Sequence, residues 1–175
     1  GQAGYLDETF GDGGVVNSVL NARSIITYDA EILPDGKILQ CGIVMEGPTE
    51  LKYSAFVIRY HKNGSLDSTF VRNGVFSYRP GSYNHLSKLY VYPDGRILVY
   101  GASPDNNVWS VVRILQHGGL DSTFGNNGVY EEEYLDEDII IRNVKVLDDG
   151  KIVLVGGATI NGNYYPLTYR PTITV

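Results

Sequence analysis

One five-residue motif, Leu-Asp-x-Thr-Phe, constrains the fold of this chain more than any other feature, because it occurs three times. The copies occupy residues 6–10, 66–70 and 120–124, and a glycine follows each motif aspartate at the same offset. The three aspartates are 60 and 54 residues apart. Such periods indicate a chain built from copies of one supersecondary unit. We place these units at about 4–65, 66–119 and 120–175, within a single repeat domain of residues 1–175.

Each motif is interpreted as a structured connector between units. The aspartate carboxylate can accept the backbone N–H two residues further on, which favours a local turn. The leucine and phenylalanine are expected to anchor this turn to a core, and the glycine suits a position with positive φ. A catalytic or metal-binding role is disfavoured, because three equivalent carboxylates on separate units do not converge on one site. The structural motif comprises Asp7, Phe10, Gly14, Asp67, Phe70, Gly74, Asp121, Phe124 and Gly128.

A second motif, Pro-Asp-Gly or Asp-Asp-Gly, follows the connector aspartates by 28, 27 and 28 residues. Apolar residues alternate before it and form a nearly continuous run after it, which predicts a tight hairpin. The continuous runs, at 38–42, 97–101 and 152–156, are typical of strands covered on both faces. The glycine that ends each run predicts a bulge or a close backbone approach. Further strands are expected just after each connector glycine, and at 55–60, 110–115 and 166–170.

The sequence therefore predicts an all-β, β-propeller-like chain of three four-stranded antiparallel blades. A unit of this size cannot bury both of its apolar faces alone, so it must stack on neighbours. Closed propellers have about four to eight blades, and three blades would leave two faces uncovered. The chain also begins with a connector and ends with a blade, so its two ends are complementary. We expect either a homodimer that closes a six-bladed ring or further blades from a longer chain.

Composition excludes several classes of protein. The net charge of −6 argues against nucleic acid as a partner, because phosphate binding needs a basic face. No apolar run approaches the roughly 18–20 residues of a membrane span. The single cysteine, Cys41, excludes an intrachain disulfide framework, and its place in an apolar run predicts a core position.

The two motifs together, Leu-Asp-x-Thr-Phe-Gly-x-x-Gly and then Pro-Asp-Gly-Lys-Ile, resemble the delta-60 repeat family of bacterial surface and secreted proteins. Residues 6–14, 66–74 and 120–128 carry the first motif, and 34–38 and 93–97 carry the second, with Arg96 in place of lysine. Val71 and Asp148 depart from the pattern, since they replace a glycine and a proline. The resemblance implies a β-propeller fold and an exported location: extracellular, cell surface or periplasmic. It carries over no catalytic residue.

Titratable residues give no prediction of a catalytic, metal or cofactor site. His61, His85 and His117 lie at dissimilar places in the repeats, so they are interpreted as solvated loop residues. The acidic run at 131–138 could supply oxygen ligands to Ca²⁺, but it lacks the alternating aspartates and central glycine of a calcium loop. A solvated strand and loop is the favoured interpretation of this run.

Three arginines, Arg59, Arg113 and Arg170, occupy the same place in the last strand of each unit. They could form a ring around a ligand. The favoured interpretation is that each pairs with a connector carboxylate and forms a charge-assisted latch between blades.

Aromatic residues supply the candidate ligand-binding surface. Rings that carry hydroxyl groups suit sugar faces and protein surfaces, although tyrosine also simply favours strands. The candidates are Trp109, Tyr164 and Tyr165, which follow variable loops, together with Tyr83. The leading hypothesis is a non-catalytic binding or assembly module of an exported bacterial protein, with a protein or glycan ligand. The rival is a carbohydrate-active hydrolase or lyase on a propeller scaffold, which rests on fold analogy alone.

Overall fold

The computed structural model describes residues 4–18, 20, 22–46, 52–71, 73–79, 85–103, 108–133, 139–171 and 173. These residues form strands and turns, and none of them forms a helix long and apolar enough to cross a membrane. The strands are β1 (Ser24–Ile32), β2 (Ile38–Glu46), β3 (Lys52–Tyr60), β4 (Val75–Tyr78), β5 (His85–Val91), β6 (Ile97–Ser103), β7 (Val108–Ile114), β8 (Val129–Glu133), β9 (Ile139–Val146), β10 (Ile152–Ile160) and β11 (Asn163–Tyr169).

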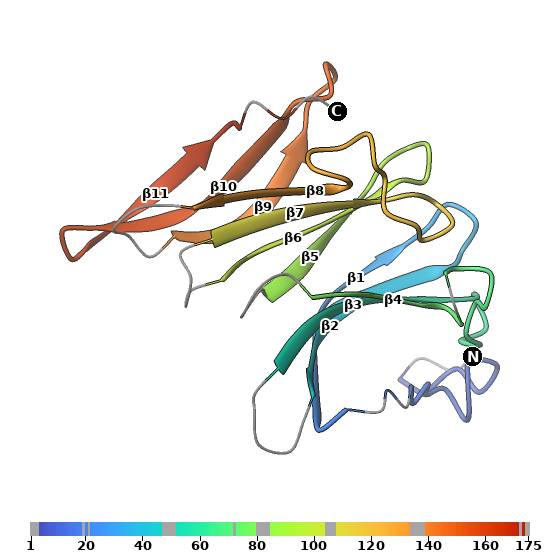
Figure 1. Ribbon diagram of the computed structural model, residues 1–175. Coiled ribbons are helices and arrows are strands. Elements are labelled where there is room, and N and C mark those ends of the chain that lie inside the picture. Colours follow the sequence, from blue (N-terminus) through green and yellow to red (C-terminus); the bar gives the residue numbers. More distant parts are fainter. Residues whose placement is uncertain are drawn as a thin grey trace.

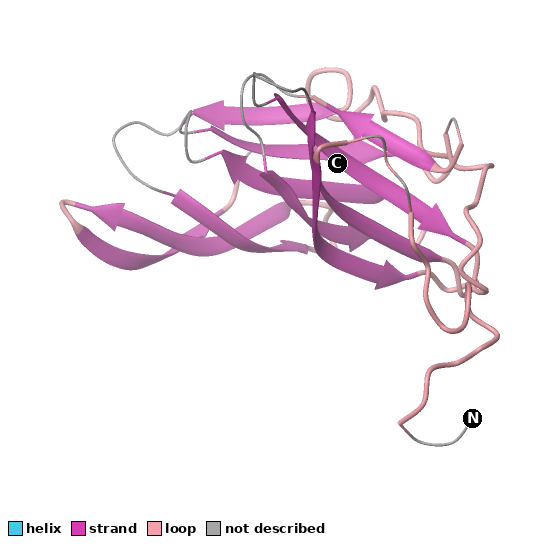
Figure 2. Cartoon of the chain, turned by 90° about the horizontal axis from the view of Figure 1, so that it is seen from below, coloured by secondary structure: helices cyan, strands magenta, loops and turns pink. Residues whose placement is uncertain are grey.

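The strands form three antiparallel sheets. The first sheet has the order β1-β2-β3-β4, the second β5-β6-β7-β8 and the third β11-β10-β9. Figure 1 shows the sheets stacked in chain order, from the first in blue and green to the third in orange and red. Figure 2 shows the same stack from below. The all-β, three-sheet architecture predicted from the sequence is confirmed, but the third sheet has three strands among the described residues instead of the four expected.

The strands after the second and third connectors join the preceding sheet, so the prediction that they open their own units is wrong. Strand β4 pairs with β3, with Val75 opposite Ile58, and β8 pairs with β7 in the same register. The connector reverses the chain direction, and the strand that leaves it runs back along the strand that entered it. The strand expected at 15–16 makes only an isolated bridge, between Asp12 and Val15, within the described residues.

The three predicted hairpins form at the Pro-Asp-Gly and Asp-Asp-Gly turns and join β1 to β2, β5 to β6 and β9 to β10. A β-bulge interrupts β1, β5 and β9 where they face the glycine that ends each apolar run. A Cβ atom on Gly42 would lie 2.0 Å from the backbone oxygen of Ile26, and one on Gly156 would lie 1.9 Å from that of Ile140. Both the bulge and the close approach predicted for these glycines are therefore present.

Two apolar cores lie between the sheets. Strand β6 contributes to both: Ile97 and Val99 pack in the core with the first sheet, and Leu98 and Tyr100 pack in the core with the third. Alternate side chains of a strand point to opposite faces, so a strand between two cores must be apolar at every position. Cys41 is fully buried in the first core, as predicted.

Candidate functional site

Two buried clasps hold the connectors to the sheets. In the first clasp (Arg59, Asp67, Thr69 and Phe70), Nε of Arg59 donates to Oδ2 of Asp67 over 2.8 Å. The Arg59 guanidinium also lies 4.6 Å from the centre of the Phe70 ring. Both the N–H and the hydroxyl of Thr69 donate to Oδ1 of Asp67, so each of the two carboxylate oxygens accepts hydrogen bonds.

The second clasp (Arg113, Asp121, Thr123 and Phe124) repeats this geometry. Nε of Arg113 donates to Asp121 over 2.8 Å, and its guanidinium lies 4.7 Å from the Phe124 ring centre. Phe70 and Phe124 are fully buried. The motif leucines were also expected as anchors, but this is wrong: Leu66 is 44% exposed and Leu120 is 39% exposed. Arg59 and Arg113, in contrast, are buried against the phenylalanine rings.

The first clasp also links one unit to the next. Nη1 of Arg59 donates to the carbonyl oxygen of Gln116 over 2.6 Å, and the N–H of Val71 donates to His117 over 2.8 Å. The latch between units is therefore made by the arginine and the connector backbone together. In the second clasp, Nη1 of Arg113 is buried and has no hydrogen-bond partner among the described residues.

Arg170 forms no such clasp. It is exposed, and it makes no ion pair with a connector carboxylate among the described residues. Of the three pairs between an arginine and a connector carboxylate that were predicted, those at Arg59 and Arg113 are present among the described residues, and the arginine contact to the next unit is seen at Arg59. Asp7 is the corresponding unpaired carboxylate, since it accepts hydrogen bonds from Thr9 like the other connectors but contacts no arginine in the described part of the chain.

The clasps keep their carboxylates ionised. Burial opposes ionisation of Asp67, but hydrogen bonds from Thr69 and the charges of Lys37 and Arg59 outweigh it and lower the pKa below its usual value. Burial likewise opposes ionisation of Asp121, and Thr123 and Arg113 lower its pKa overall. Each aspartate therefore binds a proton less readily in the folded protein than in the unfolded chain.

This shift predicts acid sensitivity. A lowered folded-state pKa stabilises the protein above the unfolded aspartate pKa of about 3.9, and this stability is lost as the pH falls toward the folded-state value. We expect urea midpoints to be nearly constant between about pH 7 and 5 and to fall steadily below about pH 4. The Asp67→Asn variant should start lower and fall less steeply. Parallel curves for the two proteins would show that Asp67 does not contribute to the acid response.

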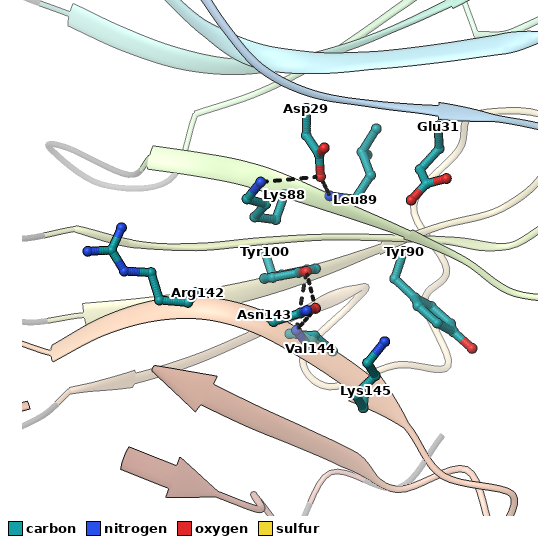
Figure 3. Close-up of a pocket in the computed structure, with 10 residues that line it drawn as sticks. All are labelled: Asp29, Glu31, Lys88, Leu89, Tyr90, Tyr100, Arg142, Asn143, Val144 and Lys145. Carbon is teal, nitrogen blue, oxygen red and sulfur yellow. Dashed lines mark hydrogen bonds and ion pairs between the residues drawn. The ribbon is translucent and has the colours of Figure 1, made fainter. Parts of the chain in front are cut away.

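A polar pocket of about 240 Å³ lies between β1, β5 and β9, the first strand of each sheet, which we call the inner strands. Its lining comes from β1, β5, β6 and β9 and is shown in Figure 3: Asp29, Glu31, Lys88, Leu89, Tyr90, Tyr100, Arg142, Asn143, Val144 and Lys145. Charged side chains of both signs and two tyrosines therefore border one space.

Two of the lining side chains link neighbouring sheets. Asp29 of β1 accepts from the backbone N–H of Leu89 in β5 over 3.1 Å, and the hydroxyl of Tyr100 in β6 accepts from the N–H of Val144 in β9 over 3.2 Å. The Tyr100 hydroxyl in turn donates to Oδ1 of Asn143 over 3.3 Å. Burial raises the pKa of Tyr100 to about 12, so its hydroxyl stays protonated at neutral pH and can keep donating.

The aromatic residues predicted to bind a ligand do not gather at this pocket. Trp109 is only 3% exposed and packs in the core between the second and third sheets, so the surface position expected for it is wrong. Both faces of β7 are covered, which leaves no surface for the indole. Tyr164 and Tyr165 lie on β11 and are 58% and 47% exposed. Tyr83 lies outside the described residues.

Sequence reasoning missed the pocket residues. The available signal was a polar residue at the same place in each inner strand, just before the alternating apolar pair: Asp29, Lys88 and Asn143. The described residues contain no group of three or more His, Cys, Asp or Glu side chains able to hold a metal ion. Part of the acidic run, residues 134–138, lies outside the described residues. Burial raises the pKa of the Cys41 thiol to about 12, which makes it a poor nucleophile.

Comparison with known proteins bears on the fold. The model of one family, described as a domain of unknown function (DUF5122) beta-propeller, matches residues 33–70 and 93–124. The match supports a propeller repeat family. Its two segments run from the first hairpin turn through the second connector, and from the second hairpin turn to the end of the third connector motif. No curated protein and no solved structure matches the chain.

Proposed function

We propose that this chain is a non-catalytic binding or assembly module of an exported bacterial protein, built from propeller repeats of the delta-60 type. The polar pocket carries the binding part of this proposal, because three sheets contribute charged and hydroxyl-bearing side chains to one space. Binding sites of this kind place a few polar groups where separate structural elements meet. The export part rests on the resemblance of the connector and hairpin motifs to the delta-60 repeats.

The proposed ligand is a glycan or a polar peptide. Lysine, arginine and asparagine side chains donate hydrogen bonds, and Asp29 and Glu31 accept them from hydroxyl groups. Tyr90 offers a ring that is packed edge-on against Tyr92 and is therefore held in place. A ligand rich in hydroxyl and carboxylate groups matches this lining better than an apolar one.

A glycan and peptide binding screen, read by calorimetry, tests this function. The protein should bind at least one ligand, and the Arg142→Ala/Lys145→Ala variant should bind it at least about tenfold more weakly, as expected for loss of polar contacts. Both side chains are exposed, so their removal should leave folding intact. Lys62→Ala, an exposed lysine that does not line the pocket, is the control. Equal affinity in all three proteins would place the binding elsewhere and contradict the pocket.

One observation favours the rival, an enzyme acting on carbohydrate. Asp29 and Glu31 lie two apart on β1 and line the same pocket as Tyr90 and Tyr100, and paired carboxylates are the catalytic groups of most glycosidases. Against this role, Asp29 accepts the N–H of Leu89 and lies 3.8 Å from Nζ of Lys88, so it is engaged in structural contacts. A sugar-release assay distinguishes the two. Release by the wild type that is lost in Glu31→Gln would establish the enzyme, and binding without release supports the non-catalytic module.

We also propose that a second copy completes the propeller. Three sheets are half of a six-bladed ring, and closed propellers of about four to eight blades leave no blade face uncovered. Two copies related by a twofold axis would close such a ring through two identical contacts. Further blades from a longer chain are the alternative source of the missing half.

A further inference from the structure

In the two four-stranded sheets, the last strand (β4 or β8) follows a connector, whereas the other three strands precede it. Val75 of β4 lies opposite Ile58, the residue before Arg59, and Val129 of β8 lies opposite Val112, the residue before Arg113. The third sheet ends at β11, whose outer edge carries no paired strand among the described residues. This edge therefore presents backbone donors and acceptors of the kind that a further strand would satisfy.

The first connector is folded like the other two and contacts the loop after β3, where the N–H of Gly11 donates to the carbonyl oxygen of Asn63 over 2.9 Å. The segment after it, however, joins no sheet among the described residues. The N–H and hydroxyl of Thr9 donate to Asp7 over 3.0 and 2.7 Å, and the N–H of Gly14 donates to Phe10 over 2.9 Å. The equivalent bonds close the second and third connectors. Asp67 is fully buried and Asp121 is 5% exposed, whereas Asp7 lies in solvent without an arginine. Within the described part of the chain, Asp7 therefore lacks the arginine partner that the other two connector aspartates have.

Arg170 on the third sheet is the arginine that corresponds to the unpaired Asp7. It directly follows β11, as Arg59 lies near the end of β3 and Arg113 near the end of β7. Each of the two paired arginines binds the aspartate eight residues later in the chain through a 2.8 Å bond from Nε. Arg170 is exposed and makes no ion pair with a connector carboxylate among the described residues, although its charge helps to lower the pKa of Asp149 in the hairpin turn. Figure 1 shows the N-terminal segment beside the first sheet and β11 at the outer edge of the third.

We propose that the outer edge of β11 binds residues 6–16 of a second copy of this chain. Asp7 of that copy would pair with Arg170, Val15 would lie opposite Tyr169 and Val16 opposite Thr168. This register repeats the one by which Val75 and Phe76 face Ile58 and Val57 in the first sheet. The inference rests on the proposed completion by a second copy and specifies which residues meet. The opposite charges of Asp7 and Arg170 select this occupant over an unrelated strand.

Pro166 limits the length of the added strand. The N–H of Arg59 points to β4, where it donates to the carbonyl of Gly74, and alternate residues of β3 point the same way. The equivalent outward positions of the third sheet are Arg170, Thr168 and Pro166. Proline has no N–H, so pairing should end there. The added strand is thus short, as β4 is.

A charge exchange tests this contact. Asp7→Arg alone and Arg170→Asp alone should each weaken dimerisation roughly 30-fold or more, because like charges would then meet at both contacts. An equimolar mixture of the two variants should restore the dimer, since every contact in the mixed dimer again joins opposite charges. Glu8→Arg makes the same change in net charge one residue away. Its counterparts Ser68 and Ser122 stay exposed in docked connectors, so it should leave the dimer unchanged.

A cysteine pair tests the register. The Val16→Cys/Thr168→Cys variant should form a disulfide between two copies under mild oxidation, whereas Val16→Cys/Asn163→Cys should not. The native Cys41 is buried and does not interfere.

A dimer that is indifferent to the charge exchange and forms no crosslink would overturn this contact while leaving completion by a second copy intact. A monomer at all concentrations would overturn both. Open head-to-tail chains that respond to the charge exchange would support the contact and contradict the closed ring.

Discussion

Replacing Asp67 with alanine is expected to lower the free energy of unfolding by about 3–5 kcal/mol, the typical cost of removing one partner from a buried ion pair. Arg59 is only 5% exposed, and its Nε bond to Asp67 joins it to an opposite charge, which helps to offset the burial of its own. Without the carboxylate, the hydroxyl and N–H of Thr69 also lose their acceptor. The connector should therefore loosen together with the unit contact at Gln116.

Urea denaturation of Asp67→Ala and Asp7→Ala provides a matched comparison. The two aspartates occupy the same place in the same motif and accept the same bonds from threonine, but only Asp67 meets an arginine. Asp7→Ala should leave the urea midpoint of a dilute, monomeric sample almost unchanged. If both variants unfold at the wild-type midpoint, the clasp does not stabilise the fold.

Replacing Phe124 with alanine should cost a similar amount, about 3–5 kcal/mol, as for other fully buried phenylalanines. The Phe124 ring is fully buried in the core between the second and third sheets, and it also lies beneath the Arg113 guanidinium. Truncation would leave a cavity and remove one face of the arginine's packing.

Leu120→Ala is the control for Phe124, because this leucine belongs to the same connector but is 39% exposed. Its truncation should cost about 1 kcal/mol or less. Thermal or urea unfolding of the two variants decides the point. Equal losses would mean that the motif anchors its sheet through both apolar residues rather than through the phenylalanine and arginine.

Much of the fold follows from local sequence signals. The hairpin turns, the two-sided burial of β6 and the bulges opposite Gly42 and Gly156 all depend on residues within one hairpin or one strand. Local sequence signals do not determine which sheet the strand after a connector joins. The apolar pattern around Val75 fits pairing with the strand before the connector or with the one after it. The buried Arg59–Asp67 bond and the backbone bonds of the connector accompany the first arrangement, and the apolar pattern does not reveal them.

The candidate sites were also hard to predict, because they depend on contacts between separate units. Trp109 follows a variable loop, which suggested a surface position, but β7 lies in the middle of the stack and both of its faces are covered. The pocket brings together Asp29, Lys88 and Asn143 from three units. They come from β1, β5 and β9, and they border one space only once the three sheets have stacked.

The central claim is that this chain is half of a ring that a second copy completes by the same clasp that joins its own sheets. Light scattering on the purified chain, coupled to size-exclusion chromatography over a range of concentrations, tests it most directly. We predict a stable species of twice the 19.3 kDa chain mass, which dissociates in Asp7→Arg and reforms when Arg170→Asp is added. A single species of 19.3 kDa at micromolar and higher concentrations would contradict the claim.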